Sequence, residues 1–139
     1  MTLAERLVIN EDQGNLGTFA PNIWPVHRYR AIMATLDRLF VLADYMEVRN
    51  FVFLHPWLAP LLIEAAREVA LHFPESAAAP SLQVVVDPEE TQDNAQLVLW
   101  IRTDLPPESA LANLRNLDVD WWLRVASIAE GKLCLMLAP

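Results

Sequence analysis

The sequence has little cysteine, lysine or glycine, and each shortage removes a class of function. Cys134 is the only cysteine, so the chain forms no intrachain disulfide and offers no cysteine cluster for zinc. Of the three glycines only Gly14 and Gly17 lie close together, and no lysine follows them as a phosphate-binding loop requires. The sequence therefore excludes the common nucleotide-binding folds.

Charge and hydropathy narrow the class further. The net charge of −8 disfavours nucleic-acid binding, which depends on neutralising phosphates, and apart from Lys132 the basic residues are scattered arginines. No apolar run approaches the ~20 residues that span a bilayer. Met1–Asn10 lacks the basic start and apolar stretch of a signal peptide. We therefore expect a cytoplasmic protein without membrane insertion, whose acidic surface suits a basic protein partner or serves solubility alone.

The 139 residues have the length of one domain, and three segments differ in their patterns. Residues 1–22 are polar and rich in turn residues, which indicates an N-terminal arm. Residues 23–75 carry apolar residues at helical spacing and predict a helical half. Its expected helices run from Pro25 to about Glu47, over Val48–Leu54, and from about Trp57 to Phe73.

Residues 81–138 change to a period of two and predict a ββααβ half. Strands are expected from Ser81, over Leu97–Ile101 and over Lys132–Ala138, with helices from Pro107 to about Leu117 and from Asp118, a plausible N-cap, to Glu130. Gly131 suits the left-handed position that ends the last helix. The sequence thus predicts an α+β fold of order α-α-α-β-β-α-α-β, with a small three-stranded, mainly antiparallel sheet and two helices inserted before the last strand.

The predicted sheet is apolar on both faces. In each strand one alternating set is aliphatic, as in any half-buried strand. A sheet with one solvated face carries polar residues in the other set. Here the middle of that second set is also apolar, with Val85, Val98, Trp100, Cys134 and Met136.

Two arrangements account for this second apolar set. By default the N-terminal helices cover one face and the helices of residues 107–130 cover the other, as in layered domains. Alternatively, part of the second face or a strand edge binds a partner or a second copy of the chain.

Five tryptophans are many for a chain of this length. Trp121 and Trp122 are adjacent near the start of the last predicted helix, so we expect one in the core and the other at its margin. Tryptophan is enriched at binding hot spots, and Leu123 lies on the polar side of the same helix. The candidate interface residues are therefore Trp100, Trp121, Trp122 and Leu123.

One helix carries a row of possible metal ligands. Glu64, Glu68 and His72 follow one another at intervals of four residues, which aligns them on one side of the helix. Successive donors then lie ~6 Å apart, a spacing that suits no compact metal site without ligands from elsewhere. A solvated helix face is the simpler interpretation.

Other residues with catalytic chemistry are not arranged as an active site. His27, Arg28 and Arg30 gather at the start of the first helix, where they are candidates for an anion-binding site. No serine lies in a Gly-x-Ser-x-Gly elbow, and Cys134 is expected in mid-strand. The sequence therefore predicts no catalytic residue, no metal and no cofactor.

Several stretches resemble a group of short, uncharacterised proteins found mainly in cyanobacteria. They are His55-Pro56-Trp57-Leu58 through His72-Phe73-Pro74, Leu105 through Leu111, and Asp118 through Leu137 with its segments Asp120-Trp121-Trp122-Leu123 and Gly131-Lys132-Leu133-Cys134. The resemblance covers about residues 50 to 138. The group carries no known activity, so it implies no catalytic residues. Its short, acidic members look like one half of a two-gene system, such as the antitoxin of a toxin–antitoxin pair.

We therefore predict a non-enzymatic protein-binding module, either an adaptor or an antitoxin-like protein that neutralises its partner, with homodimerisation as a further possibility. Its partner would be another protein or the chain itself. One alternative is a small enzyme or anion-binding domain that uses His27, Arg28 and Arg30. Another is a structural subunit of a larger assembly.

Overall fold

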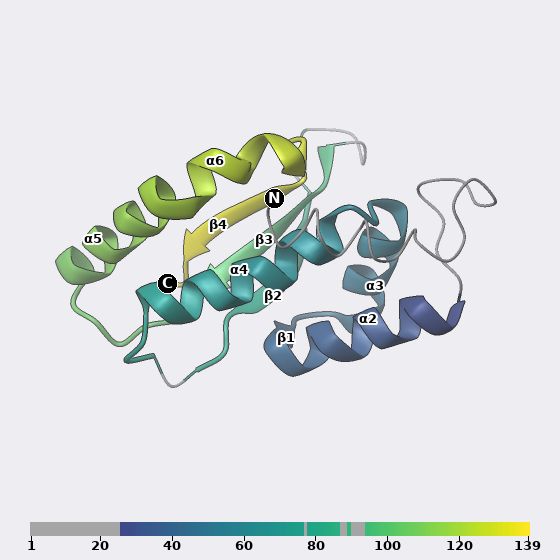
Figure 1. The fold of residues 1–139 in the computed structure, drawn as a ribbon, viewed down its shortest axis with the longest axis horizontal. Helices are drawn as coiled ribbons and strands as arrows, with labels where there is room; N and C mark the ends of the chain where they lie inside the picture. The colour runs from purple at the N-terminus through teal and green to yellow at the C-terminus, as the bar shows by residue number, and fades with distance from the viewer. Residues whose placement is uncertain (1–25, 77, 87–88, 90–93) are drawn as a thin grey trace.

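The computed structural model describes residues 26–76, 78–86, 89 and 94–139 (Figure 1). The arm predicted for residues 1–22 lies outside the described residues. In chain order the elements are α2 (Val26–Leu39), β1 (Val41–Leu42), α3 (Tyr45–Leu54), α4 (Leu58–His72), β2 (Ser81–Val85), β3 (Gln96–Ile101), α5 (Pro107–Leu117), the π-helical turn η2 (Asp118–Trp122), α6 (Leu123–Val125), the 3₁₀ turn η3 (Ala126–Ala129) and β4 (Leu133–Leu137).

The first predicted helix is in fact two helices separated by a short strand. The Val41 N–H donates to the Pro80 carbonyl at 2.9 Å, which ties β1 to the start of β2. Asp44 then begins α3, because its side chain accepts a hydrogen bond from the Glu47 N–H at 3.1 Å. The helical prediction across these residues was wrong, since a long-range strand pairing overrides the local apolar spacing.

The sheet has four strands in the order β1-β2-β3-β4. β1 pairs with β2 in parallel, β2 with β3 antiparallel, and β3 with β4 in parallel. The α+β class is confirmed, but the predicted three-stranded, mainly antiparallel sheet is wrong. Helices connect β1 to β2 and β3 to β4, and a helical crossover returns the chain to the same end of the sheet, which makes each of these pairs parallel.

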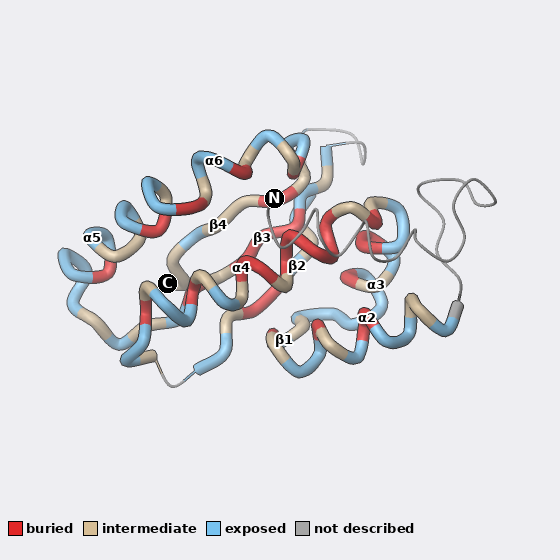
Figure 2. The backbone as a smooth tube through the Cα atoms, in the orientation of Figure 1, coloured by how far each residue is buried: buried red, intermediate tan, exposed pale blue. Residues whose placement is uncertain are grey.

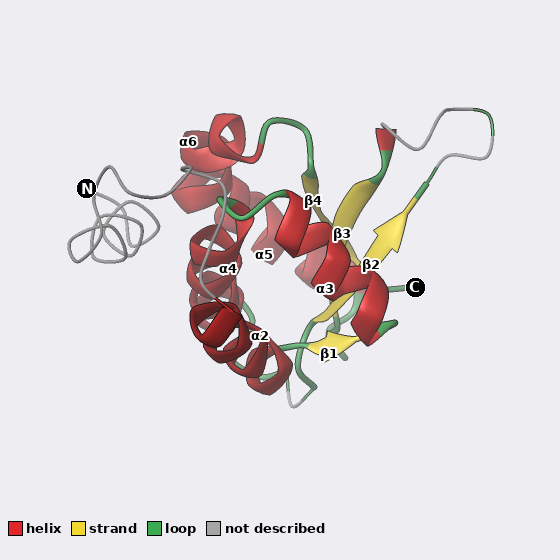
Figure 3. Ribbon diagram, turned by 90° about the vertical axis from the view of Figure 1, so that its right-hand side faces the viewer, coloured by secondary structure: helices red, strands yellow, loops and turns green. Residues whose placement is uncertain are grey.

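Both groups of helices lie on the same side of the sheet. Figure 3 shows α2, α4, α5 and α6 to one side of the strands. Buried residues concentrate where α4 passes β2 and β3 (Figure 2). A single core cluster contains residues from both helical groups and from the strands, among them Leu36, Val52, Leu62, Leu82, Leu97, Leu99, Ile101, Leu117 and Trp121. The default expectation of one helical group on each face is therefore wrong.

The apolar residues of α4 face the core, where Leu58, Leu62, Ala65 and Val69 are buried. One glutamate of α4, Glu64, is buried among them. In the part of the chain that the structure describes, no helix is long and apolar enough to cross a bilayer.

The helix boundary predicted at Asp118 is wrong. This residue has helical dihedral angles (φ −60°, ψ −51°), so it does not cap a new helix and the chain continues from α5 into the π-helical turn. The predicted left-handed end at Gly131 is confirmed by its φ of 75°. Glu130 also has a positive φ of 53°, and these two residues together turn the chain into β4.

Candidate functional site: the uncovered face of the sheet

The face of the sheet that points away from the helices keeps its apolar middle. The strand register places Val41, Ser81, Trp100 and Met136 in one row across the sheet, and Gln83, Val98 and Cys134 in the next. None of these residues belongs to the core cluster or packs against it. We call this surface, formed by these seven residues and Val85, the open face.

The open face is covered least toward its rim. Val98 lies on the central strand between its register partners Gln83 and Cys134 and is 5% exposed. Met136 on the outer strand is 44% exposed, and Trp100 is partly exposed. The described helices, α3 included, contribute buried residues to the core cluster, which contains no residue of the open face. The second apolar set identified in the sequence therefore faces outward.

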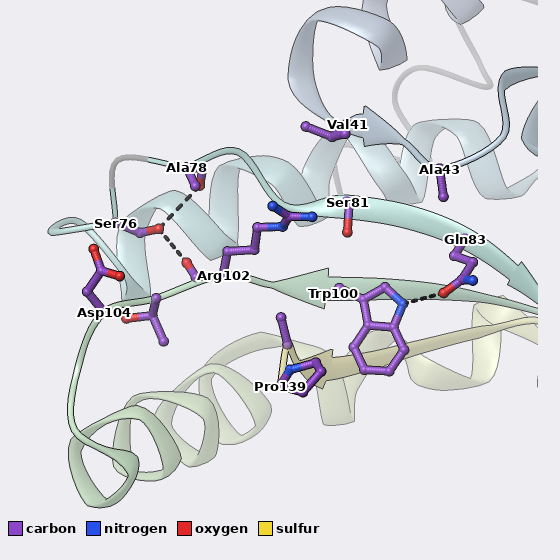
Figure 4. Close-up of a pocket in the computed structure, with 12 residues that line it drawn as sticks. Val41, Ala43, Ser76, Ala78, Ser81, Gln83, Trp100, Arg102, Asp104 and Pro139 are labelled. Carbon is purple, nitrogen blue, oxygen red and sulfur yellow. Dashed lines mark hydrogen bonds between the residues drawn. The ribbon is translucent and has the colours of Figure 1, made fainter.

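A cavity of about 700 Å³ lies at one end of the open face, where β1, β2 and the end of β3 meet (Figure 4). The Trp100 indole N–H donates to Gln83 Oε1 at 3.0 Å, which fixes the orientation of the ring. The Ser76 hydroxyl donates to the Ala78 carbonyl at 3.2 Å and also to the Arg102 carbonyl. These bonds hold the segment before β2 against the end of β3, which closes one side of the cavity.

Arg102 supplies the positive charge of the cavity. It follows β3 two residues after Trp100, so both side chains lie on the open-face side of the strand. Among the described residues its guanidinium has no hydrogen-bond or ion-pair partner. Figure 4 shows the guanidinium pointing toward Ser81, with Asp104 at the opposite end of the cavity. The strand positions of the open face itself carry no acidic residue.

The structure does not bring the four candidate interface residues together. Trp121 is 3% exposed and its indole N–H donates to Glu64 Oε1 at 2.6 Å, so it is a core residue, as expected of one member of the pair. Trp122 is half-buried against the same core, and Leu123 is 68% exposed. These three residues lie on the helical side of the molecule. Only Trp100 lies on the open face.

The anion-site candidates lie on the first turns of α2, away from the cavity. His27 and Arg30 are exposed and Arg28 is half-buried. None of the three lines the cavity beside Trp100. The structure therefore places these candidates apart from the cavity.

The row on α4 is part of an interface between helices rather than a solvated face, so that interpretation was wrong. Glu64 is buried against Trp121. His72 Nδ1 lies 2.9 Å from the Glu68 carbonyl oxygen, and its Nε2 lies 3.0 Å from Asp120 Oδ2. Both ring nitrogens face acceptors, so both can donate a hydrogen bond when the ring is protonated. No group of three histidine, cysteine or acidic residues in the described ranges is arranged to hold a metal.

Opposing effects set the pKa of His72. Burial alone lowers it, but the hydrogen bonds to Asp120 and the Glu68 carbonyl and the charges of Glu68 and Asp120 together raise it above its ordinary value. Burial also raises the pKa of the Cys134 thiol, which keeps this open-face residue protonated and a poor nucleophile.

The cavity is the part of the site that the sequence did not predict. β1 and the segment around Ser76, which close the cavity, depend on long-range contacts. The signal in the sequence was the period of two that continues from Val98 through Trp100 to Arg102.

Comparison with known proteins provides no relative from which to transfer a role: no protein-family model, curated protein or solved structure matches this chain. The function is therefore inferred from the geometry and chemistry of the open face.

Proposed function

We propose that this chain is a non-enzymatic protein-binding module whose open face holds a short apolar segment of a partner protein. The observation that carries the proposal is an apolar sheet face that no described helix covers. A sheet face that meets water is normally polar, whereas an exposed apolar patch marks an interaction site. An adaptor and an antitoxin-like neutralising protein would both use such a surface.

The size of the open face favours a segment over a folded partner. Three strands of five or six residues and the two-residue β1, spaced about 4.8 Å apart, cover roughly 300 Å² of flat area. Each member of a standard stable complex buries about 800 Å². Even allowing for the relief of the side chains, the open face alone is too small for a globular surface, or for a second copy stacked face to face. An extended segment of about five residues matches its length.

A basic charge on the partner would act at a distance. The net charge of −8 attracts a basic protein during the approach. The strand positions of the open face carry no acidic residue, so the contact itself does not supply this attraction. Long-range attraction would therefore change the association rate and its dependence on salt more than the strength of the contact.

A second candidate, a homodimer, is favoured by the position of β4 at the edge of the sheet, where no other described strand pairs with it. The Leu97 N–H donates to the Lys132 carbonyl and the Ala138 N–H to the Ile101 carbonyl, so even-numbered residues of β4 bond to β3. The backbone groups of its odd-numbered residues therefore point to the outer edge, which carries no charge and no proline. If two copies join antiparallel at this edge, sedimentation velocity should show a dimer. The dimer should persist in the Met136→Glu variant, because that side chain lies on the open face and not at the backbone edge. A monomer at micromolar concentrations would contradict it.

Affinity purification from the native host tests the main proposal with two matched variants. Met136→Glu puts a charge on the open face, and Leu123→Glu puts the same charge on an exposed position of the helical side. We expect the wild type and Leu123→Glu to retain the same partner, and Met136→Glu to lose it. Each bait must first unfold cooperatively, and calorimetry with the purified partner must reproduce the difference. A partner lost with Leu123→Glu but kept with Met136→Glu, or a wild-type bait that retains none, overturns the proposal.

A further inference from the structure

The chemistry of the cavity beside Trp100 is more specific than that of the rest of the open face. Its polar groups at the Trp100 end are hydrogen-bond donors. The Arg102 guanidinium carries five N–H groups. The Gln83 side-chain oxygen already accepts a hydrogen bond from Trp100, so the NH₂ group of Gln83 remains to donate. Ser81, which is 6% exposed, adds a hydroxyl. Donors without a matching acceptor recognise an anion, and a guanidinium fits a carboxylate through two parallel hydrogen bonds.

We propose that this cavity binds the carboxylate of an aspartate or glutamate side chain in the partner segment, with Arg102 as its counter-ion. The proposal rests on the open face being the binding surface and names the chemistry that the face selects. The carboxylate lies at the Arg102 and Ser81 end of the cavity. Asp104 lines the other end, where it repels a misplaced carboxylate (Figure 4).

The spacing along β3 sets the pattern of the segment. Arg102 follows Trp100 by two residues on the same side of the strand, so their Cα atoms lie about 7 Å apart. In an extended segment, side chains two positions apart have the same spacing and point in the same direction. An apolar side chain over the Trp100 indole therefore requires the acidic residue two positions away. A carboxylate one position away points to the opposite side of the segment.

The cation of this cavity is open to a ligand. Among the described residues the Arg102 guanidinium has no acidic partner, and the residue is exposed. A ligand carboxylate can therefore pair with it through two parallel hydrogen bonds, and water and salt reach the pair. The contribution of Arg102 to binding is therefore expected to fall as salt is added.

Titrations monitored by nuclear magnetic resonance test the proposal without a known partner, because the Trp100 indole N–H is a reporter inside the cavity. The small-molecule probes are hexanoate and hexanamide, which share an apolar tail and differ in the charge of the head group. We expect hexanoate to shift the Trp100 signal with saturation and to bind at least about tenfold more tightly than hexanamide, the difference that a charged hydrogen-bonded pair provides. Arg102→Gln should abolish this preference, whereas Arg115→Gln, an exposed position on α5, should keep it.

Capped peptides then test the spacing. A peptide with the order Leu-Thr-Glu should bind more tightly than its Leu-Thr-Gln and Leu-Glu-Thr counterparts, and only through Arg102. Equal shifts with hexanoate and hexanamide, or a preference that survives Arg102→Gln, overturn the carboxylate site. A partner that needs Met136 while hexanoate shows no preference leaves the proposed function standing and this inference refuted. The reverse result leaves the carboxylate site standing alone.

Discussion

Neighbouring residues of β3 should respond very differently to truncation, because they face opposite sides of a sheet covered on one side. Leu99 has no exposed surface and lies in the core cluster. Leu99→Ala should therefore destabilise the fold by about 2–5 kcal/mol. Trp100 is a larger side chain on the open face, where its losses are one hydrogen bond to Gln83 and the contacts of a partly exposed ring. Trp100→Ala should cost only about 1–2 kcal/mol.

This inverted order distinguishes a one-sided from a two-sided architecture. If helices covered both faces, Trp100→Ala would cost about 3–5 kcal/mol, at least as much as the leucine substitution. Urea denaturation followed by far-ultraviolet circular dichroism measures both values without depending on tryptophan fluorescence, and equal m-values would show that the unfolding reaction is unchanged. A Trp100→Ala variant as unstable as Leu99→Ala would refute the one-sided sheet.

Three further predictions concern the helical side and the turn before β4. Because the pKa of His72 is raised in the folded state, its stabilising effect is complete below the unfolded value of about 6.5 and is lost as the pH rises through the folded pKa. Asp120→Asn should lower the pKa of His72 in a proton NMR titration, and an unchanged titration would contradict the pairing. Trp121→Phe removes the 2.6 Å hydrogen bond to Glu64 and should lower the free energy of unfolding by about 1–3 kcal/mol. A double-mutant cycle with Glu64→Gln should show coupling between the two residues, and strictly additive energies would disprove it. Gly131→Ala should cost about 1 kcal/mol from its positive φ alone, since an added Cβ meets no atom within 4 Å, and Gly131→Asn should cost less. A neutral alanine variant in thermal unfolding would contradict that conformation.

Local patterns predicted the elements that depend on local physics. The apolar spacing of α4, the proline at the start of α5 and the left-handed Gly131 each express a short-range preference, and the structure confirms all three. β1 has only two residues, and it forms because the Val41 N–H donates a hydrogen bond to the carbonyl of Pro80, far along the chain. The preference of the isolated segment was helical, and a long-range pairing of this kind leaves no period in the sequence.

The placement of the helices shows a second limit of sequence patterns. An amphipathic helix must bury its apolar stripe, but the stripe does not indicate which face of a sheet it meets. In the structure, Glu64 contacts Trp121 and His72 contacts Asp120. Because these contacts join α4 to the turn after α5, both helical groups lie on one side of the sheet. Each of these pairs is separated by about fifty residues in the sequence, which is why the row on α4 resembled a solvated face.

The candidate site was predicted in its apolar part and missed in its polar part. The second apolar set correctly indicated which residues share a face, because alternation alone decides this, but the default expectation that helices cover that face was wrong. The cavity around Arg102 needs β1, the Ser76 segment and the end of β3 at once. Of the two adjacent tryptophans, Trp121 lies in the core and Trp122 lies at its margin.

The accessibility of the open face is the claim on which both proposals depend, and the tryptophan indoles measure it directly. A soluble paramagnetic gadolinium chelate broadens the NMR signals of protons that it can approach. The Trp100 indole N–H lies on the open face, whereas the Trp121 indole N–H is buried against Glu64. In dilute protein we predict strong broadening of the Trp100 signal and little broadening of the Trp121 signal. A Trp100 signal as well protected as that of Trp121 would show that the face is covered and would contradict the account.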